Sequence, residues 1–269
     1  MTAFHSILLV GCGNMAGAML RGWLASGLAA ERFAVVDPAA RDLPAGVRSL
    51  ASVPADEPFD AVLLGVKPQV LRDVAPAVEP AAGPQTTVMS ILAGVELAVL
   101  AAHFPRAAGF LRVMPNLAAA LGKSPMGVAE RGLDPAGREA AMALLAPLGA
   151  PEWIEEAEFD LVTALAGSGP AFVYRFIDAL SAAAAELGLE QGKARRLALA
   201  MVDGASALAA ASPYDPGELA RRVASPGGVT LAGLEMLDRD GTLTHLLEQT
   251  LRAARDRSAQ MAAQARGEG

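Results

Sequence analysis

The sequence predicts an α/β protein in which a parallel sheet wrapped by helices precedes an all-helical domain. Short apolar runs alternate with segments of helical spacing through the first 158 residues, as they do in β-α-β proteins. A glycine-rich turn directly follows the first apolar run, and strand-like runs disappear after about residue 159. We therefore expect two domains, an α/β domain over residues 1–158 and a helical domain over residues 159–269.

Five apolar runs of four or five residues are the expected strands. Such runs, bounded by glycine, proline or aspartate, are typical of buried parallel strands. Met15, Met19 and Trp23 recur at helical spacing after the first run, which predicts a helix over residues 14–25. A further helix is expected from about Gln69. The expected strands are residues 7–10, 33–36, 61–64, 87–91 and 110–114.

The helices of the carboxyl-terminal half are rich in alanine and small residues. Because so much apolar small-residue surface needs a cover, we expect these helices to pack against a second copy of the chain. Ser168 is the expected N-cap of the first helix, with Pro170 near its first helical position. The expected helices are residues 170–187, 193–211, 216–223, 229–238 and 243–263.

Composition excludes several classes of function. The formal net charge of −7 argues against nucleic acid or an anionic membrane surface as a partner. The single cysteine, Cys12, and three histidines without metal-binding spacing predict neither a disulfide framework nor a metal site. No apolar stretch reaches the roughly 18 residues of a membrane span, and no leader precedes the first strand. We expect a cytoplasmic protein.

The first glycine turn fits the GxGxxG/A fingerprint of Rossmann-type dinucleotide-binding domains. It runs Gly11-Cys12-Gly13-Asn14-Met15-Ala16, after a strand and at the start of a helix, which is the context that gives the pattern its specificity. Gly11 allows the tight turn, Gly13 lets the backbone approach a pyrophosphate, and Ala16 allows close packing of strand and helix. The sequence therefore predicts a Rossmann-type domain that binds NADH or NADPH.

Asp37 ends the second strand and is the candidate ligand of the cofactor ribose. A carboxylate there can bond the 2′-hydroxyl of NADH and would repel the 2′-phosphate of NADPH. Asp37 could instead only begin the Asp37-Pro38 turn, and Arg41 could offer a phosphate a partner. The preference between the two cofactors therefore stays open.

Further candidate cofactor residues follow the third, fourth and fifth strands. Open α/β sheets bind ligands at the carboxyl edge of their strands. Lys67 lies at that edge, although it could also be a solvated lysine before a proline turn. Ala93-Gly94 and Pro115-Asn116 are expected at the same edge, as a rim for the nicotinamide and its ribose.

A second glycine-rich helix start, Ser225-Pro226-Gly227-Gly228-Val229-Thr230, lies far downstream. Proline suits the entry of a helix, and paired glycines remove side chains from its first turn. The backbone N–H groups of that turn have no partner inside the helix, so they can hold a carboxylate. The alternative is an ordinary helix–helix turn.

With these motifs the chain resembles the pyrroline-5-carboxylate reductase family, in which a cyclic imine is reduced to proline. The last two of five matching blocks are the specific ones. The blocks are Gly11-Cys12-Gly13-Asn14-Met15-Ala16, Val66-Lys67-Pro68, Arg112-Val113-Met114-Pro115-Asn116, Ala166-Gly167-Ser168-Gly169-Pro170-Ala171 and Ser225-Pro226-Gly227-Gly228-Val229-Thr230.

The resemblance implies a role for each site residue. The substrate carboxylate and ring are expected at the second glycine turn, with the Thr230 hydroxyl as catalytic hydrogen-bond partner of the ring nitrogen. Assembly is expected as a homodimer through the helical domain, and as a ring of dimers. Ser52 departs from the family, since several relatives have an asparagine there. Taken together with the motifs above, the candidate cofactor residues are Gly11, Gly13, Asn14, Met15, Ala16, Asp37, Val66, Lys67, Pro68, Ala93, Gly94 and Asn116; the candidate substrate residues are Ser225, Gly227, Gly228, Val229 and Thr230.

Two other functions remain as alternatives. β-Hydroxyacid dehydrogenases join a similar glycine-turn domain to helices, but they use a lysine where this chain has Tyr174 and Arg175. A non-catalytic nucleotide-sensing protein would explain the first glycine turn and not the second. Reduction of a protonated imine needs orientation more than acid–base catalysis, which suits a sequence without a paired acid–base constellation.

Overall fold

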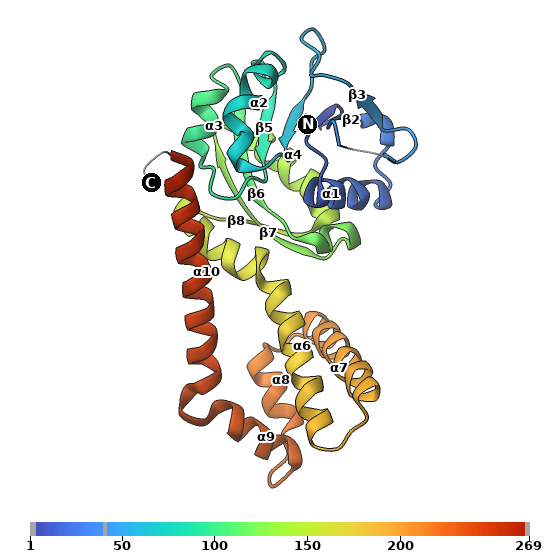
Figure 1. Ribbon diagram of the computed structural model, residues 1–269, viewed down its shortest axis with the longest axis vertical. Helices are drawn as coiled ribbons and strands as arrows, with labels where there is room; N and C mark the ends of the chain where they lie inside the picture. The colour runs from blue at the N-terminus through green and yellow to red at the C-terminus, as the bar shows by residue number, and fades with distance from the viewer. Residues whose placement is uncertain (1–3, 40–41, 267–269) are drawn as a thin grey trace. The chain divides into compact units, whose positions relative to one another are not determined.

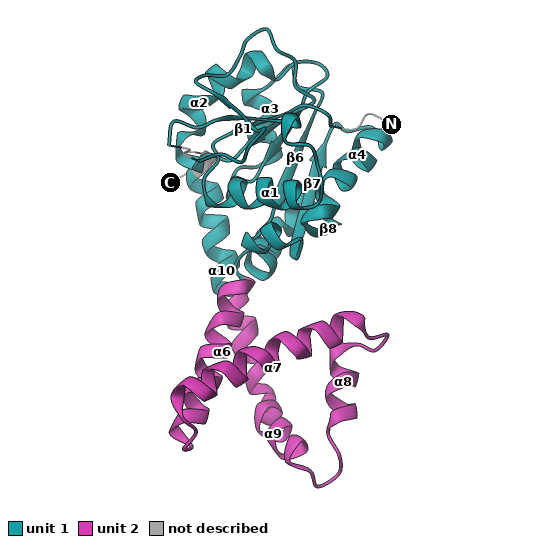
Figure 2. Ribbon diagram, turned by 90° about the vertical axis from the view of Figure 1, so that its right-hand side faces the viewer, with its two compact units in different colours: residues 1–168, 252–269 teal, residues 169–251 magenta. Residues whose placement is uncertain are grey.

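The computed structural model describes residues 4–39 and 42–266 (Figure 1). The chain forms two compact units (Figure 2). One unit contains the described residues up to Ser168 together with those from Arg252 onward, and the other is Gly169–Leu251. The boundary between the two compact units falls after Ser168. The domain boundary between residues 158 and 159 stays a prediction.

The described part of the first unit contains an eight-stranded sheet in the order β3-β2-β1-β4-β5-β6-β7-β8. All neighbouring strands are parallel except β6 and β7. This parallel-dominated sheet with helices confirms the predicted α/β class. The strands are β1 Ile7–Val10, β2 Phe33–Val36, β3 Arg48–Leu50, β4 Ala61–Leu64, β5 Thr87–Ser90, β6 Gly109–Met114, β7 Ser124–Arg131 and β8 Gly149–Trp153.

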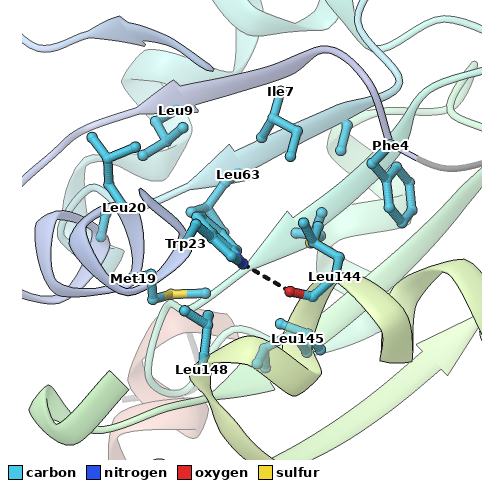
Figure 3. Close-up of a cluster of buried hydrophobic side chains, with 14 of the residues drawn as sticks. Phe4, Ile7, Leu9, Met19, Leu20, Trp23, Leu63, Leu144, Leu145 and Leu148 are labelled. Carbon is cyan, nitrogen blue, oxygen red and sulfur yellow. Dashed lines mark hydrogen bonds between the residues drawn. The ribbon is translucent and has the colours of Figure 1, made fainter. Parts of the chain in front are cut away.

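Helices cover both faces of the sheet. Helices α1 (Asn14–Ala25) and α4 (Pro135–Leu145) pack on one face, where Trp23 is fully buried. Its indole N–H donates to the Leu144 carbonyl at 2.8 Å, which joins the two helices (Figure 3). Helices α2 (Leu71–Val78) and α3 (Leu97–His103) cover the other face. The carboxyl edge of β1, β4 and β5 stays between these layers, which is where such sheets bind ligands.

The second unit is helical, as the sequence predicts. It contains α6 (Gly169–Glu186), α7 (Gln191–Ala211), α8 (Pro216–Val223), α9 (Val229–Asp238) and the first part of α10 (Thr242–Arg266). Among the described residues of α6–α9, burial is confined to Ser181, Ala194 and Ala198. Large apolar side chains are exposed on these helices instead, so the unit lacks a core of its own.

The prediction that Ser168 caps a helix is wrong. Helix α5 (Phe159–Val162) continues through a π-helical turn, Thr163–Gly167, and Ser168 itself has helical dihedral angles (φ −88°, ψ −21°). Its N–H donates to the Thr163 carbonyl at 3.0 Å. The chain is therefore already helical at Ser168, and an N-cap needs an extended backbone.

The described residues contain no single helix that is both long and apolar enough to span a membrane. The bent pair α7 and α8 meets the length and composition criterion together, with an angle of 118° between the two helices. Within residues 4–39 and 42–266, no group of three or more histidine, cysteine, aspartate or glutamate side chains could hold a metal ion.

Candidate functional site

The first glycine turn is held tightly against the end of a neighbouring strand. Gly11 has a positive φ of +85°, and its N–H donates to the Val36 carbonyl at 2.9 Å. A Cβ atom at Gly11 would lie 2.8 Å from the Val66 amide nitrogen. The structure thus brings Gly11 of the fingerprint together with Val66 of the second predicted block, and only glycine fits this turn.

Gly13 leaves the start of α1 open. It is the N-cap residue, and no described side chain caps that end of the helix. A Cβ atom added at Gly13 would meet no described atom within 4 Å. The N–H groups of Asn14, Met15 and Ala16 have no intrahelical acceptor because they are in the first turn. An open helix end of this kind suits a pyrophosphate anion.

Asp37 supports the glycine turn from the end of β2. One carboxylate oxygen accepts the Cys12 N–H at 2.7 Å, and the other accepts the Ala39 N–H at 2.8 Å. The residue therefore starts a turn, and its oxygens keep lone pairs that a ribose hydroxyl could use. Burial, followed by the Asp37 charge, raises the pKa of the Cys12 thiol. Arg41 lies outside the described residues.

The residues after β4 and β5 lie at one rim. Lys67 is exposed and directly precedes a short 3₁₀ turn, Pro68–Val70. A cavity of about 300 Å³ has Pro68 and Ala93 in its lining, together with Met261 of α10. Two predicted cofactor residues from different loops are thus brought together.

Gly94 is buried and packs against the last turns of α10. Its φ is +75°, and a Cβ atom there would lie 2.9 Å from the Ala262 backbone nitrogen. Because the neighbouring atom belongs to a helix backbone, it cannot move aside as a flexible side chain could. Gly94 therefore has a packing role whether or not it touches a cofactor.

Asn116 connects three segments from a buried position. Its backbone N–H donates to Ser124 Oγ, its Oδ1 accepts the Ala118 N–H, and its Nδ2 donates to the Ala166 carbonyl, each at 2.9 Å. The side chain holds the π-helical turn against the end of β6. One N–H of the amide remains for another acceptor.

The second glycine turn lies in the helical unit. Gly228 donates its N–H to the Ser225 carbonyl at 2.9 Å, and Gly227 has a positive φ of +70°. These four residues form a β-turn that ends at the N-cap of α9, where no side chain among the described residues provides a cap. The amides of Val229 and Thr230 are therefore open, and the Val229 side chain is 92% exposed.

Gly228 could not carry a larger side chain without a shift. A Cβ atom there would lie 2.5 Å from Ser225 Oγ and 3.0 Å from the Ser225 carbonyl oxygen. The pair of glycines keeps this helix end bare, which is the geometry that an incoming carboxylate needs. Both glycine turns thus offer uncapped backbone amides to an anion, one in each compact unit.

Arg112 lies in one of the matching blocks, but its sequence context predicts no role for it. Its side chain is 3% exposed in strand β6, and it contacts Glu156 at 3.3 Å. The signal in the sequence is a charge inside an apolar strand. Its partner is 44 residues away, so no local pattern could identify it.

Comparison with known proteins adds two family matches. Residues 156–261 match the model for pyrroline-5-carboxylate reductase dimerisation. Residues 6–94 match the model described as NADP oxidoreductase, coenzyme F420-dependent. The two matches fall on the helical part and on the glycine-turn part of the chain, respectively.

Curated relatives match along the whole chain. The pyrroline-5-carboxylate reductase of Pseudomonas aeruginosa is 38% identical over 268 residues, covering 96% of this chain and 97% of the relative. Pyrroline-5-carboxylate reductase 2 of Bacillus subtilis is 33% identical, covering 94% and 95%.

Solved structures agree. A pyrroline-5-carboxylate reductase from Coxiella burnetii aligns with a TM-score of 0.86 at 26% identity, covering 96% of this chain and 99% of its own. The NADP-bound pyrroline carboxylate reductase of Plasmodium falciparum shares the fold, with a TM-score of 0.82 at 22% identity over 96% and 98% of the two chains. On the strength of the curated relatives, the chain belongs to the pyrroline-5-carboxylate reductase family.

Proposed function

We propose that this chain is an NAD(P)H-dependent pyrroline-5-carboxylate reductase, which catalyses the last step of proline biosynthesis. Hydride goes to the C=N carbon of 1-pyrroline-5-carboxylate, and the product is L-proline. The observation that carries the proposal is that the chain matches the family along its whole length and keeps both bare glycine turns. Each turn suits one of the two anions that the reaction brings together, a pyrophosphate and a carboxylate.

The cofactor site that we propose is the carboxyl edge of β1, β4 and β5. The open amides of Asn14, Met15 and Ala16 would hold the pyrophosphate, since nothing described covers the end of α1 at Gly13. Val66, Lys67, Pro68, Ala93, Gly94 and Asn116 would line the ribose and nicotinamide side. When bound, the reduced nicotinamide supplies the hydride.

Asp37 would contribute to the ribose end of the cofactor, because its carboxylate oxygens retain lone pairs beyond their bonds to Cys12 and Ala39. A carboxylate favours a 2′-hydroxyl over a 2′-phosphate. The proposal covers both NADH and NADPH. The ratio of the kcat/KM values for the two cofactors decides which one the enzyme prefers.

The substrate site that we propose is the turn from Ser225 to Thr230. The bare amides after Gly227 and Gly228 would anchor the carboxylate, with Val229 beside the ring, and the Thr230 hydroxyl would hydrogen-bond the ring nitrogen. The substrate nitrogen is protonated when the carbon accepts hydride, so little acid catalysis is required. Orientation of this kind lowers a barrier by up to about 7–11 kcal/mol in favourable model reactions.

The family is oligomeric through its helical region, and we propose a homodimer for this chain, with a ring of dimers as the larger assembly. Support comes from the dimerisation model matched over residues 156–261 and from the exposed apolar side chains of α6–α9. A second copy would cover these side chains. The cytoplasmic location stays a prediction. The exclusion of nucleic acid and membrane partners is also a prediction, which the net charge of −7 motivates.

The test is steady-state oxidation of NADH and of NADPH by the purified chain with 1-pyrroline-5-carboxylate. We expect imine-dependent oxidation and L-proline as product. Cofactor binding without turnover would support the nucleotide-sensing alternative and refute the reductase. Oxidation of 3-hydroxy acids without imine reduction would support the β-hydroxyacid dehydrogenase alternative.

A further inference from the structure

Arg112 is a buried cation in β6, an interior strand of the sheet. Its guanidinium carbon lies 3.8 Å from the centroid of the Phe159 ring, and its Nη1 lies 3.3 Å from Glu156 Oε1. Its Nε has no hydrogen-bond partner in the part of the chain that the structure describes. Burial lowers the pKa of Arg112, and the charges of Glu156, Asp160 and Glu96 oppose that shift. Burying a cation is costly unless it is paired, and these anions offset that cost.

The anions around Arg112 are connected to the rim of the proposed cofactor site. Glu156 Oε1 also accepts the N–H of Leu97, the first residue of α3, at 2.7 Å. Leu97 follows the loop that contains Ala93 and Gly94. The position of that loop is therefore fixed at its end by a carboxylate that Arg112 holds.

A second connection reaches the same loop through α10. Asp160 Oδ1 accepts the Ser258 hydroxyl at 2.7 Å. One turn further along α10, the Ala262 backbone lies against Gly94, where a Cβ atom would be only 2.9 Å away. The two connections converge on the Ala93–Gly94 loop, one from α3 and one from α10.

We infer that Arg112 is a positioning residue for the cofactor. By pairing with Glu156, it fixes the start of α3 and through it the Ala93–Gly94 loop. The nearby charge of Asp160, which accepts the Ser258 hydroxyl, adds a link to the end of α10. The inference rests on the proposed function in one respect, the contact of that loop with the nicotinamide side of the cofactor. Arg112 itself does not touch the reacting atoms.

The chain offers a closely matched control. Arg138 lies 4.3 Å over the Trp153 ring and pairs with Glu130 at 2.6 Å, and Glu130 also accepts the N–H of Leu133. Glu130 pairs with Leu111 in the sheet register, so its side chain belongs to the opposite face from Arg112. The Glu130 network repeats the chemistry of the Glu156 network. Glu130 lines the same cavity as Glu156 and Leu97, but its bonds go to Arg138 and Leu133 and not to the start of α3.

The experiment compares Glu156→Gln, Ser258→Ala and Arg112→Lys with Glu130→Gln. Dissociation constants for NADPH are measured by titration, alongside kcat, both KM values and the thermal midpoint. Glutamine can still accept the Leu97 N–H, so Glu156→Gln removes mainly the charge that faces Arg112. We expect it to weaken NADPH binding about tenfold, equivalent to ~1.4 kcal/mol. We expect Ser258→Ala to weaken NADPH binding about threefold, because it loses one hydrogen bond. Arg112→Lys should weaken NADPH binding by an amount between these two.

We expect the imine KM of the variants to stay within about twofold of the parent value. The NADPH dissociation constant of Glu130→Gln should also stay within about twofold, since neither quantity depends on the rim. NADPH affinity that is unchanged in both Glu156→Gln and Ser258→Ala, even with a lower thermal midpoint, would overturn the inference. An equal loss in Glu130→Gln would overturn it as well. Because NADPH binding is measured directly, these outcomes remain readable if the parent chain fails to reduce the imine, and that failure would count against the proposed function alone.

Discussion

Substitution of the two fingerprint glycines by alanine separates fold from cofactor binding. Gly11 has a φ of +85°, and its added Cβ would lie 2.8 Å from a backbone nitrogen of Val66. Gly13 has ordinary dihedral angles (φ −69°, ψ −163°), and its added Cβ would meet no described protein atom within 4 Å. We expect Gly11→Ala to damage the protein itself and Gly13→Ala to damage the binding of an anion at the open end of α1.

The expected magnitudes follow from these contacts. A left-handed alanine costs roughly 1–2 kcal/mol, and overpacking adds roughly 1–3 kcal/mol. Gly11→Ala should therefore lower the free energy of unfolding by about 2–5 kcal/mol and the thermal midpoint by about 5–20 °C. Gly13→Ala should cost less than about 1 kcal/mol, the usual difference between glycine and alanine at an N-cap.

For cofactor binding we expect the opposite order. Relative to the stability that each variant loses, Gly13→Ala should weaken cofactor binding more than Gly11→Ala. A methyl group at Gly13 stands where a pyrophosphate would approach the amides of Asn14 and Met15. Loss of one charge-assisted hydrogen bond is worth roughly 1.5–3 kcal/mol, so the dissociation constant should rise about 10–100-fold.

The assay pairs thermal unfolding with titration of NADH and NADPH, using the same preparation of each variant. Gly83→Ala is the matched control, because a Cβ there also meets no described atom within 4 Å and the residue lies away from the fingerprint. Undiminished cofactor affinity in a well-folded Gly13→Ala variant would refute the account of this turn. A Gly11→Ala variant as stable as the parent would refute the steric reasoning.

Three further predictions concern other residues. Thr230→Ala should lower kcat/KM for the imine about tenfold, while Thr250→Ala, whose hydroxyl donates to the Leu246 carbonyl, should leave it unchanged; equal values for both would remove the role given to Thr230. Because the pKa of Cys12 is raised, less thiolate is present at neutral pH, so iodoacetamide should react with Cys12 more slowly than with free cysteine and faster as pH rises; a rate that matches the free thiol would contradict this. Leu208→Asp should disrupt the oligomer in light scattering, since this side chain is 62% exposed in the described chain, and an unchanged mass would mean that α7 lies outside the interface at this point.

Local patterns in the sequence predicted the elements that depend on local chemistry. Strands β1, β2 and β4 and the turn after Gly11 were predictable because a buried parallel strand is an uninterrupted apolar run and the glycine spacing is short. Helices α8 and α9 begin at Pro216 and just after Gly228, where the sequence places their start signals.

The elements that the sequence did not predict depend on distant contacts. Strand β3 has three residues at a sheet edge, and β7 contains Pro125 and Gly127, which hide its pattern. Ser168 was misread because Ser-Gly-Pro looks like a helix start, whereas the preceding α5 and π-helical turn already make it helical.

The same limit applies to the candidate site. Both glycine turns could be found from the sequence, since each is one continuous motif. The bond of Asn116 to Ala166 spans 50 residues, and that of Asp160 to Ser258 spans 98. Neither pairing has a spacing rule, so these links become visible only when the fold brings the segments together.

The most direct test of the account is a crystal structure of the protein grown with L-proline. We predict the proline carboxylate within hydrogen-bond distance of the Val229 and Thr230 amides at the start of α9, with the ring nitrogen facing the Thr230 hydroxyl. Proline bound elsewhere, with the Gly227–Gly228 turn empty, would contradict the claim that this helix end holds the substrate.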